Sequence, residues 1–199
     1  MAEYKAIHGT TVSNRTSDPL AAGVAGATWA TGGAMNTGKN RAYGTGTQTA
    51  ALAAGGYAPS VTVNVEEYNG TSWSEGPDMN TAKVGCAGAG TITAALATSG
   101  TAGPGSITTD TEEYNGSSWS EQNNVSTARL YHTGCGTQTA GIIFGGSTSA
   151  GAPFTPTANT EEYDGTNWTA GGTLITPMGV MGCAGIQTAC ITFGGTPGI

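Results

Sequence analysis

Three pairs of adjacent glutamates are the first residues that could do chemistry, because two carboxylates can serve as general acid and general base. Adjacent residues of a β-strand point to opposite faces, however, so the two carboxylates of one pair cannot act on one substrate. Their repetition also fits structure better than a single active site. The pairs are Glu66-Glu67, Glu112-Glu113 and Glu161-Glu162.

The four cysteines and two histidines could ligate a metal or act in nucleophilic catalysis. Zinc sites need paired ligands at short spacing, and the sequence has no CxxC motif. His8 and His132 lie far apart, and no Ser/His/Asp arrangement is visible. We therefore expect no enzyme, no metal site and no cofactor, with the cysteines as small buried apolar residues. Cys183 and Cys190 flank one turn and should face each other, which leaves a cross-strand disulfide open.

The composition is low in charge and rich in glycine. Among 199 residues there are 34 glycines, charged residues make up 10%, and the net charge is −7 with only six basic residues. A nucleic-acid-binding surface or a polybasic membrane patch is excluded on this balance. No apolar run is long enough to insert into a membrane. The N-terminus has no basic region followed by an apolar one, so a secretory signal is absent or already removed.

A fourfold repeat is the dominant pattern of the sequence. Trp29, Trp73, Trp119 and Trp168 follow one another at spacings of 44, 46 and 49 residues. Glycine, threonine and a Gly-Gly or Ser-Gly pair recur at fixed distances after each tryptophan, and four short strands fit into each period. No stretch has sustained helical periodicity. The pattern predicts an all-β fold, a small β-propeller with four blades of four antiparallel strands.

Two local features support that fold. The first strand of each repeat is rich in Gly and Ala, as expected where inner strands crowd around a narrow axis. An Asn-Gly or Asp-Gly pair follows the tyrosine of three repeats, which predicts a two-residue hairpin turn. We expect inner strands such as residues 130–135 and 140–144.

Closure of the ring is predicted to need the N-terminal part of the chain. The last repeat, residues 179–195, contains only two inner strands, whereas residues 25–29 match residues 69–73. Residues 20–30 can therefore supply the outer strands of the fourth blade, from this chain or from a neighbouring copy. The expected organisation is an N-terminal arm, residues 1–19, and a propeller, residues 20–199.

A basic residue ten positions after three of the tryptophans is predicted to form a buried ion pair with the first glutamate of the following pair. The fourth blade would lose both partners, because Met178 and Ala22 occupy the two positions. The predicted structural pairs are Lys39 with Glu66, Lys83 with Glu112, and Arg129 with Glu161.

Several of these motifs resemble known repeats. The order Gly-Gly, Glu-Glu-Tyr, Trp and Met-Asn-Thr-Ala resembles the kelch motif. The segment Gly-Thr-Gln-Thr-Ala at residues 136–140, with Phe-Gly-Gly at 144–146 and Met-Asn-Thr-Ala at 79–82, resembles the kelch-like repeat proteins of marine tailed phages. Residues 1–5 and 14–19 resemble the N-terminal arm of those proteins. The resemblance implies a virion structural or fibre-associated component.

The expected function is thus a non-enzymatic virion component, a capsid or tail decoration protein displayed on the particle surface. Its arm would dock on other virion proteins or on copies of itself. The alternative is a glycan-binding host-attachment module, because the variable loops carry Tyr57 and Phe154, which could stack on a sugar. An enzyme ranks last.

Overall fold

The computed structural model describes residues 31–197. The chain divides into two units, Met1–Gly32 and Gly33–Ile199, and the second contains all the strands of the described residues. The expected arm, residues 1–19, and the expected outer strands at residues 20–30 lie outside the described residues.

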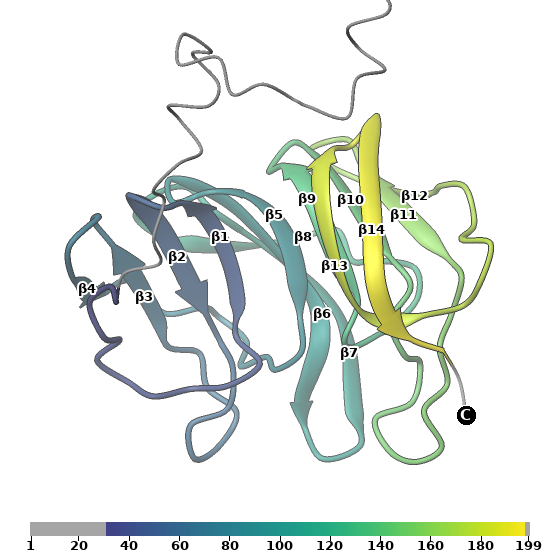
Figure 1. Cartoon of the computed structure of the whole chain (residues 1–199), viewed down its shortest axis with the longest axis horizontal. Coiled ribbons are helices and arrows are strands. Elements are labelled where there is room, and N and C mark those ends of the chain that lie inside the picture. Colours follow the sequence, from purple (N-terminus) through teal and green to yellow (C-terminus); the bar gives the residue numbers. More distant parts are fainter. Residues whose placement is uncertain (1–30, 198–199) are drawn as a thin grey trace, which may run out of the picture. The chain divides into compact units, whose positions relative to one another are not determined.

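The second unit is built from β-sheets alone (Figure 1), and within residues 31–197 no helix could cross a membrane. Three sheets of four strands and one sheet of two strands follow one another along the chain, each an antiparallel meander. The first three sheets are β1 (Tyr43–Thr47), β2 (Ala50–Ala54), β3 (Val65–Tyr68) and β4 (Trp73–Glu75); β5 (Ala87–Thr91), β6 (Ala94–Gly103), β7 (Ser106–Tyr114) and β8 (Trp119–Gln122); and β9 (Thr133–Thr137), β10 (Ala140–Phe144), β11 (Thr160–Tyr163) and β12 (Trp168–Ala170). The last sheet contains β13 (Gly179–Ile186) and β14 (Ala189–Thr196).

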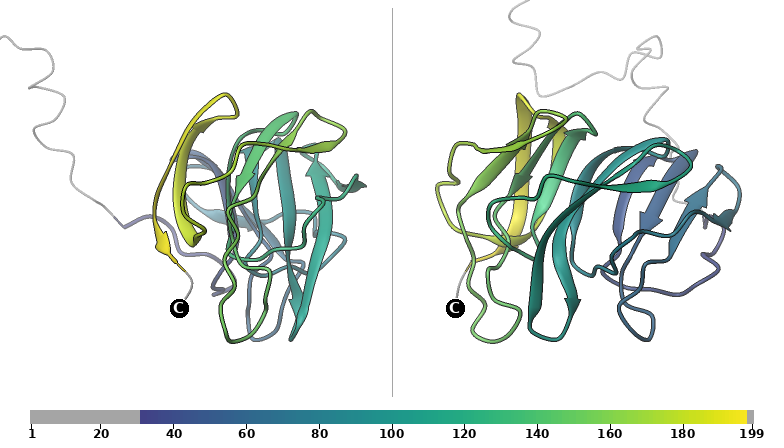
Figure 2. Two further views of the ribbon diagram at one scale, coloured as in Figure 1. Left: turned by 90° about the vertical axis from the view of Figure 1, so that its right-hand side faces the viewer. Right: turned by 180° about the vertical axis from the view of Figure 1, so that it is seen from behind.

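The first strands of the four sheets pack against one another in chain order: β1 on β5, β5 on β9, and β9 on β13. Figure 1 and Figure 2 show the corresponding sheets side by side. Glycines make this approach possible. A Cβ on Gly134 of β9 would lie 2.9 Å from the Gly88 carbonyl oxygen of β5, whereas one on Gly88 would lie 1.6 Å from the Leu96 carbonyl oxygen in its own sheet. The predicted crowding of the inner strands is therefore present between β5 and β9.

One large inner side chain uses the space that a glycine leaves. The Tyr43 ring lies against Gly88, whose Cβ position is 3.1 Å from Cζ of the ring. Its hydroxyl donates a hydrogen bond of 2.8 Å to the Ala89 carbonyl oxygen. Tyr43 is buried together with Leu52 and Val65 of its own sheet. A tyrosine from one sheet thus fills the groove over the next.

The Gly-Gly position joins each sheet to the next through the backbone. Gly56, Gly100 and Gly146 donate hydrogen bonds of 2.7, 2.9 and 2.8 Å to the carbonyl oxygens of Lys83, Arg129 and Met178. These three glycines have φ of 100°, 103° and 88°, a region that favours glycine. The repeat therefore keeps glycine here because the inter-sheet hydrogen bond requires that backbone conformation.

The predicted two-residue turn after the tyrosine is wrong. Tyr68 pairs with Trp73, so the loop has four residues, 69–72. The Asn69 side-chain oxygen accepts hydrogen bonds of 2.9 Å from the N–H groups of Thr71 and Ser72, which stabilises the longer loop. Because the loop lengthens by two residues, Tyr68 and Trp73 still share a face, and their rings lie 5.1 Å apart.

Replacing Gly88 by Ala should destabilise the protein by about 3 kcal/mol or more, because the new methyl group overlaps backbone that cannot move without separating strands. Gly103→Ala is the matched control: no atom lies within 4 Å of its Cβ position, and its effect should stay within about 0.5 kcal/mol. Urea unfolding midpoints measure both. Equal midpoints for the two variants would contradict this account of the inner strands.

Candidate functional site

A buried carboxylate ties each four-stranded sheet to the segment that leads into it. In the first sheet, Lys39 Nζ lies 3.6 Å from Glu66 Oε1. The same carboxylate accepts hydrogen bonds of 2.7 and 3.0 Å from the N–H groups of Asn36 and Thr37. In the second sheet Glu112 takes the equivalent place, with Lys83 as its cation and the N–H groups of Asn80 and Thr81 as donors.

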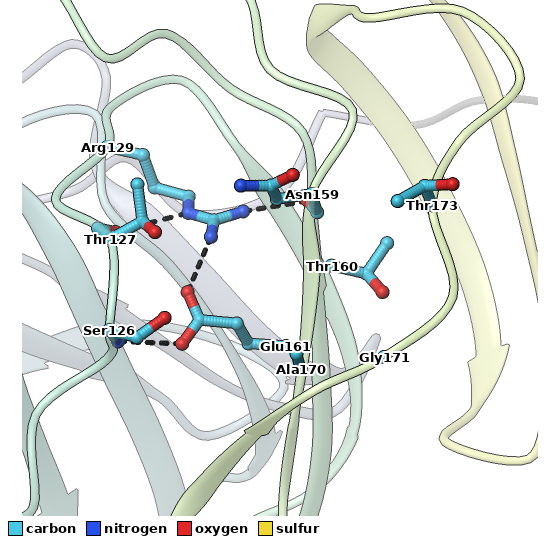
Figure 3. A pocket seen from close by; sticks show the side chains of 9 residues that line it. All are labelled: Ser126, Thr127, Arg129, Asn159, Thr160, Glu161, Ala170, Gly171 and Thr173. Carbon is cyan, nitrogen blue, oxygen red and sulfur yellow. Dashed lines mark hydrogen bonds and ion pairs between the residues drawn. The ribbon is translucent and has the colours of Figure 1, made fainter.

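The third pair lies beside a cavity of about 160 Å³ (Figure 3). Arg129 Nη2 lies 2.5 Å from Glu161 Oε1, and Glu161 Oε2 accepts 2.7 Å from the Ser126 N–H. The other guanidinium nitrogens donate to the carbonyl oxygens of Thr127 and Asn159. Every nitrogen of this guanidinium already donates a hydrogen bond, so the cavity offers no free charge to a ligand.

The structure thus brings together all six residues of the expected ion pairs. The side chains are at most 2% exposed. Burial lowers the pKa of Lys39 and of Arg129, and their partners Glu66 and Glu161 oppose that shift. Burying such charges is costly unless they are paired and hydrogen-bonded, as they are here. The six residues are therefore structural.

The second glutamate of the first two pairs has a different task. The Tyr114 hydroxyl donates 2.7 Å to Glu67 Oε1 of the preceding sheet, and the Tyr163 hydroxyl donates 3.0 Å to Glu113 Oε1. Burial, followed by the hydrogen bond to Glu67, raises the pKa of Tyr114 to about 12. In these two pairs the two carboxylates thus serve opposite faces of the sheet, and each has its own partner.

A series of backbone hydrogen bonds links residues at the entry of the four inner strands: three precede β1, β5 and β9, and Val180 lies at the start of β13. Gly85, Tyr131 and Val180 donate 3.1, 2.8 and 2.7 Å to the carbonyl oxygens of Arg41, Gly85 and Tyr131, respectively. All four residues have φ between 55° and 67°. They also occupy one repeat position, twelve residues after each tryptophan. The strand β9 begins at Thr133 and not at residue 130 as predicted, and Leu130 instead forms an isolated bridge with Ser147.

Side chains from this series line a cavity of about 380 Å³. The Arg41 guanidinium lies over the Tyr131 ring, 5.5 Å from its centroid, within the range of a cation–π interaction. A Cβ on Gly85 would lie 3.0 Å from the same ring, so this glycine leaves the ring its space. Phe154, from the loop between β10 and β11, closes another side. The lining residues are Arg41, Tyr131, Phe154, Val180 and Thr196.

Arg41 differs from the other cations of residues 31–197. Lys39, Lys83 and Arg129 are held in buried ion pairs. Arg41 is exposed, and within that range its guanidinium has no ion-pair or hydrogen-bond partner. The cavity therefore carries the one cation of the described residues that a ligand could use.

The two loop aromatics expected to bind a ligand are placed differently. Phe154 lines the cavity, whereas Tyr57 is 46% exposed and does not contribute to it. Sequence reasoning missed Arg41 and Tyr131. The position twelve residues after tryptophan holds Arg, Gly, Tyr and Val, and the positions on either side of it also vary, so no repeated residue marked it.

The histidine and the four cysteines of the described residues differ in burial and in their partners. His132 is buried, with Nε2 3.0 Å from Thr98 Oγ1. Burial, and then the charge of Arg129, lowers the pKa of His132 to about 3. The cysteines are free thiols, and the expectation that they are buried is wrong for Cys183, which is half-buried, and for Cys190, which is exposed. The expectation that Cys183 and Cys190 face each other is wrong, because Cys183 pairs with a threonine and Cys190 with a glycine across the hairpin. Residues 31–197 contain no group of three potential metal ligands.

Comparisons with known proteins identify no relative: no model of a known protein family matches the chain, and no curated protein is significantly similar to it. The cavity and the sheet-to-sheet contacts are therefore the basis for a functional assignment.

Replacing Lys83 by Met should cost about 3–5 kcal/mol, because it leaves the Glu112 carboxylate buried without a cation. Adding Glu112→Gln should recover part of that loss, since the amide keeps an acceptor for the two N–H groups and removes the charge. Asp78→Asn is the control at an exposed acid, with an effect within about 0.5 kcal/mol. Denaturant unfolding of the four proteins measures the coupling. A double variant no more stable than Lys83→Met would refute the ion-pair account.

His132 should make the protein less stable in acid. Its folded pKa, about 3, lies below the unfolded value of about 6.5. Between these values the unfolded chain binds a proton that the folded protein does not. The free energy of unfolding therefore decreases as the pH is lowered, by roughly 2 kcal/mol between pH 6.5 and pH 5. His132→Gln should remove this contribution to the slope, while His8→Gln serves as the comparison. Unfolding free energies across this pH range test it. Parallel pH profiles for the wild type and His132→Gln would exclude the effect.

Proposed function

We propose that this protein is a non-enzymatic virion component whose four sheets are the blades of a β-propeller used as a display or docking module in a capsid or tail. The virion assignment is supported by the resemblance of the repeat motifs to proteins of marine tailed phages. The propeller is supported by the serial packing of the inner strands. The observation that carries a docking role is the unfinished fourth sheet.

The second strand of the fourth sheet has a free edge. In the first three sheets the second strand pairs with a third, whereas β14 pairs within the described residues with β13 alone. Two large apolar side chains of β14, Ile191 and Phe193, are 64% and 57% exposed. An apolar, unpaired edge strand is a template for another strand and a liability if left open.

Residues 20–30 of the same chain are the proposed partner of this edge. They match the outer strands of the other repeats around Trp29, and their glutamate position is Ala22. The cation position of the fourth blade is Met178, so the ion pair is missing on both sides. An apolar pair can replace a buried ion pair without loss of stability.

A glutamine side chain that hydrogen-bonds to the preceding sheet also supports completion of the fourth blade by residues 20–30. Gln138 Nε2 donates 3.2 and 2.7 Å to the carbonyl oxygens of Ala95 and Tyr114 in the preceding sheet. Gln187 makes the equivalent bonds one sheet later. Gln48 occupies this repeat position in the first sheet and is exposed. In a completed ring it would donate to the carbonyls of Cys190 and of residue 24.

Truncation separates completion of the blade from docking by the arm. A chain starting at Asp18 should be a folded monomer, because it keeps residues 20–30. A chain starting at Thr31 should aggregate or unfold at lower temperature, because the β14 edge stays open. The full chain should form a defined oligomer through residues 1–17. Light scattering and thermal unfolding of the three chains measure this.

Each part of the proposal has its own contrary result. Equal stability and mass of the chains from Asp18 and Thr31 would refute completion by residues 20–30. Monomeric mass for both the full chain and the chain from Asp18 would refute assembly of copies through the arm. Hydrolysis of a saccharide by the purified protein would refute the non-enzymatic assignment.

A second candidate function, attachment to host glycans, is favoured by the cavity around Arg41 and Tyr131. Its volume of about 380 Å³ lies in the range of small-molecule sites. It combines aromatic side chains with one free cation, and Phe154 belongs to the loop class that varies most among the repeats.

A further inference from the structure

We infer that the cavity lined by Arg41, Tyr131 and Phe154 binds a saccharide that carries a carboxylate, such as a terminal uronic or sialic acid residue. This inference rests on the glycan-attachment candidate and specifies the class of glycan.

The charge of the ligand follows from Arg41. Its guanidinium is the one cation of residues 31–197 that no carboxylate neutralises. A planar guanidinium matches a carboxylate with two parallel hydrogen bonds. The protein has a net charge of −7, so its overall field repels anions, and an anionic ligand must be recognised by local contacts.

The shape of the ligand follows from the other lining residues. Tyr131 and Phe154 present apolar ring surface, and Thr196 adds a hydroxyl group. The Tyr131 ring also supports the guanidinium, at 5.5 Å from its centroid, which limits the orientations that Arg41 can adopt. A pyranose ring with one carboxylate offers both an apolar face and a charge, whereas a free inorganic anion would leave the aromatic walls unused.

The residues at this repeat position share one backbone conformation, although their side chains differ. Arg41, Tyr131 and Val180 share a left-handed conformation, with φ of 56°, 55° and 57°. A β-branched residue such as Val180 is rarely found there, and such strained positions cluster at functional sites. The hydrogen-bond series imposes the conformation, so side chains are displayed at this position at a cost in stability. Glycine would meet the backbone demand without strain, as Gly85 does.

Gly85 also supplies the test, because glycine variants at the other three positions should fold at least as well as the wild type. Binding is measured by calorimetry of the full chain with methyl glucuronide, methyl glucoside and glucose 6-sulfate. Methyl glucuronide should bind at least 10-fold more tightly than the other two. Arg41→Gly should weaken glucuronide binding by about 10- to 100-fold, the loss expected for hydrogen bonds to a charged group.

Tyr57→Ala is the control, since Tyr57 is an exposed loop aromatic that does not line the cavity. Its affinity should stay within about 3-fold of the wild type, whereas Tyr131→Gly should bind at least 10-fold more weakly. Thermal unfolding of each variant verifies that the fold persists.

The outcomes separate this inference from the function on which it rests. If methyl glucoside binds as tightly as methyl glucuronide, and Arg41→Gly does not change the affinity, recognition of a carboxylate is overturned while the glycan function stands. Equal binding of glucose 6-sulfate would replace the carboxylate by anions in general and also overturn it. No binding of any of the three saccharides at millimolar concentration would overturn both.

Discussion

The buried carboxylate at the first glutamate of each pair is the interaction on which the other sheet-to-sheet contacts depend. It stands in the third strand of a sheet, yet its donors come from the segment that enters that sheet: a cation and one or two backbone N–H groups. Such a group is costly to bury unless all partners are in place. It therefore fixes the path of the connection together with the register of the strand. In the first two pairs the adjacent glutamate, facing the other way, accepts a hydrogen bond from the tyrosine of the following sheet.

These ion pairs remove charged side chains from the surface. Three of the four cations of residues 31–197 and the three carboxylates paired with them are buried: Lys39 with Glu66, Lys83 with Glu112, and Arg129 with Glu161. The ion pairs recur in the first three sheets, whereas in the fourth Met178 takes the place of the cation. Within residues 31–197 the outer strands also end there, because β14 pairs with β13 alone.

Repeating residues made the architecture predictable, because a contact made three times leaves the same spacing three times. The strand 140–144 and the three ion pairs could be expected from the tryptophan period alone. The cavity could not, since Arg41, Tyr131 and Val180 are a set of unlike residues at one position, and a search for repeated motifs passes over them. The four-residue loop after Tyr68 depends on a side-chain cap by Asn69. The prediction that Cys183 and Cys190 face each other failed because the turn sets the register of β13 against β14, and in this register neither cysteine is opposite the other.

The same division between repeated and unlike residues indicates which chemistry the cavity can support. Five glutamates are held by partners outside the cavity: Glu66, Glu67, Glu112, Glu113 and Glu161. Burial, and then the charge of Arg129, lowers the pKa of His132 to about 3. The five residues that line the cavity include no carboxylate and no imidazole. They supply a guanidinium, aromatic surface and a hydroxyl, a set suited to hold an anion in one orientation. The lining therefore favours recognition of an anionic ligand that carries an apolar face.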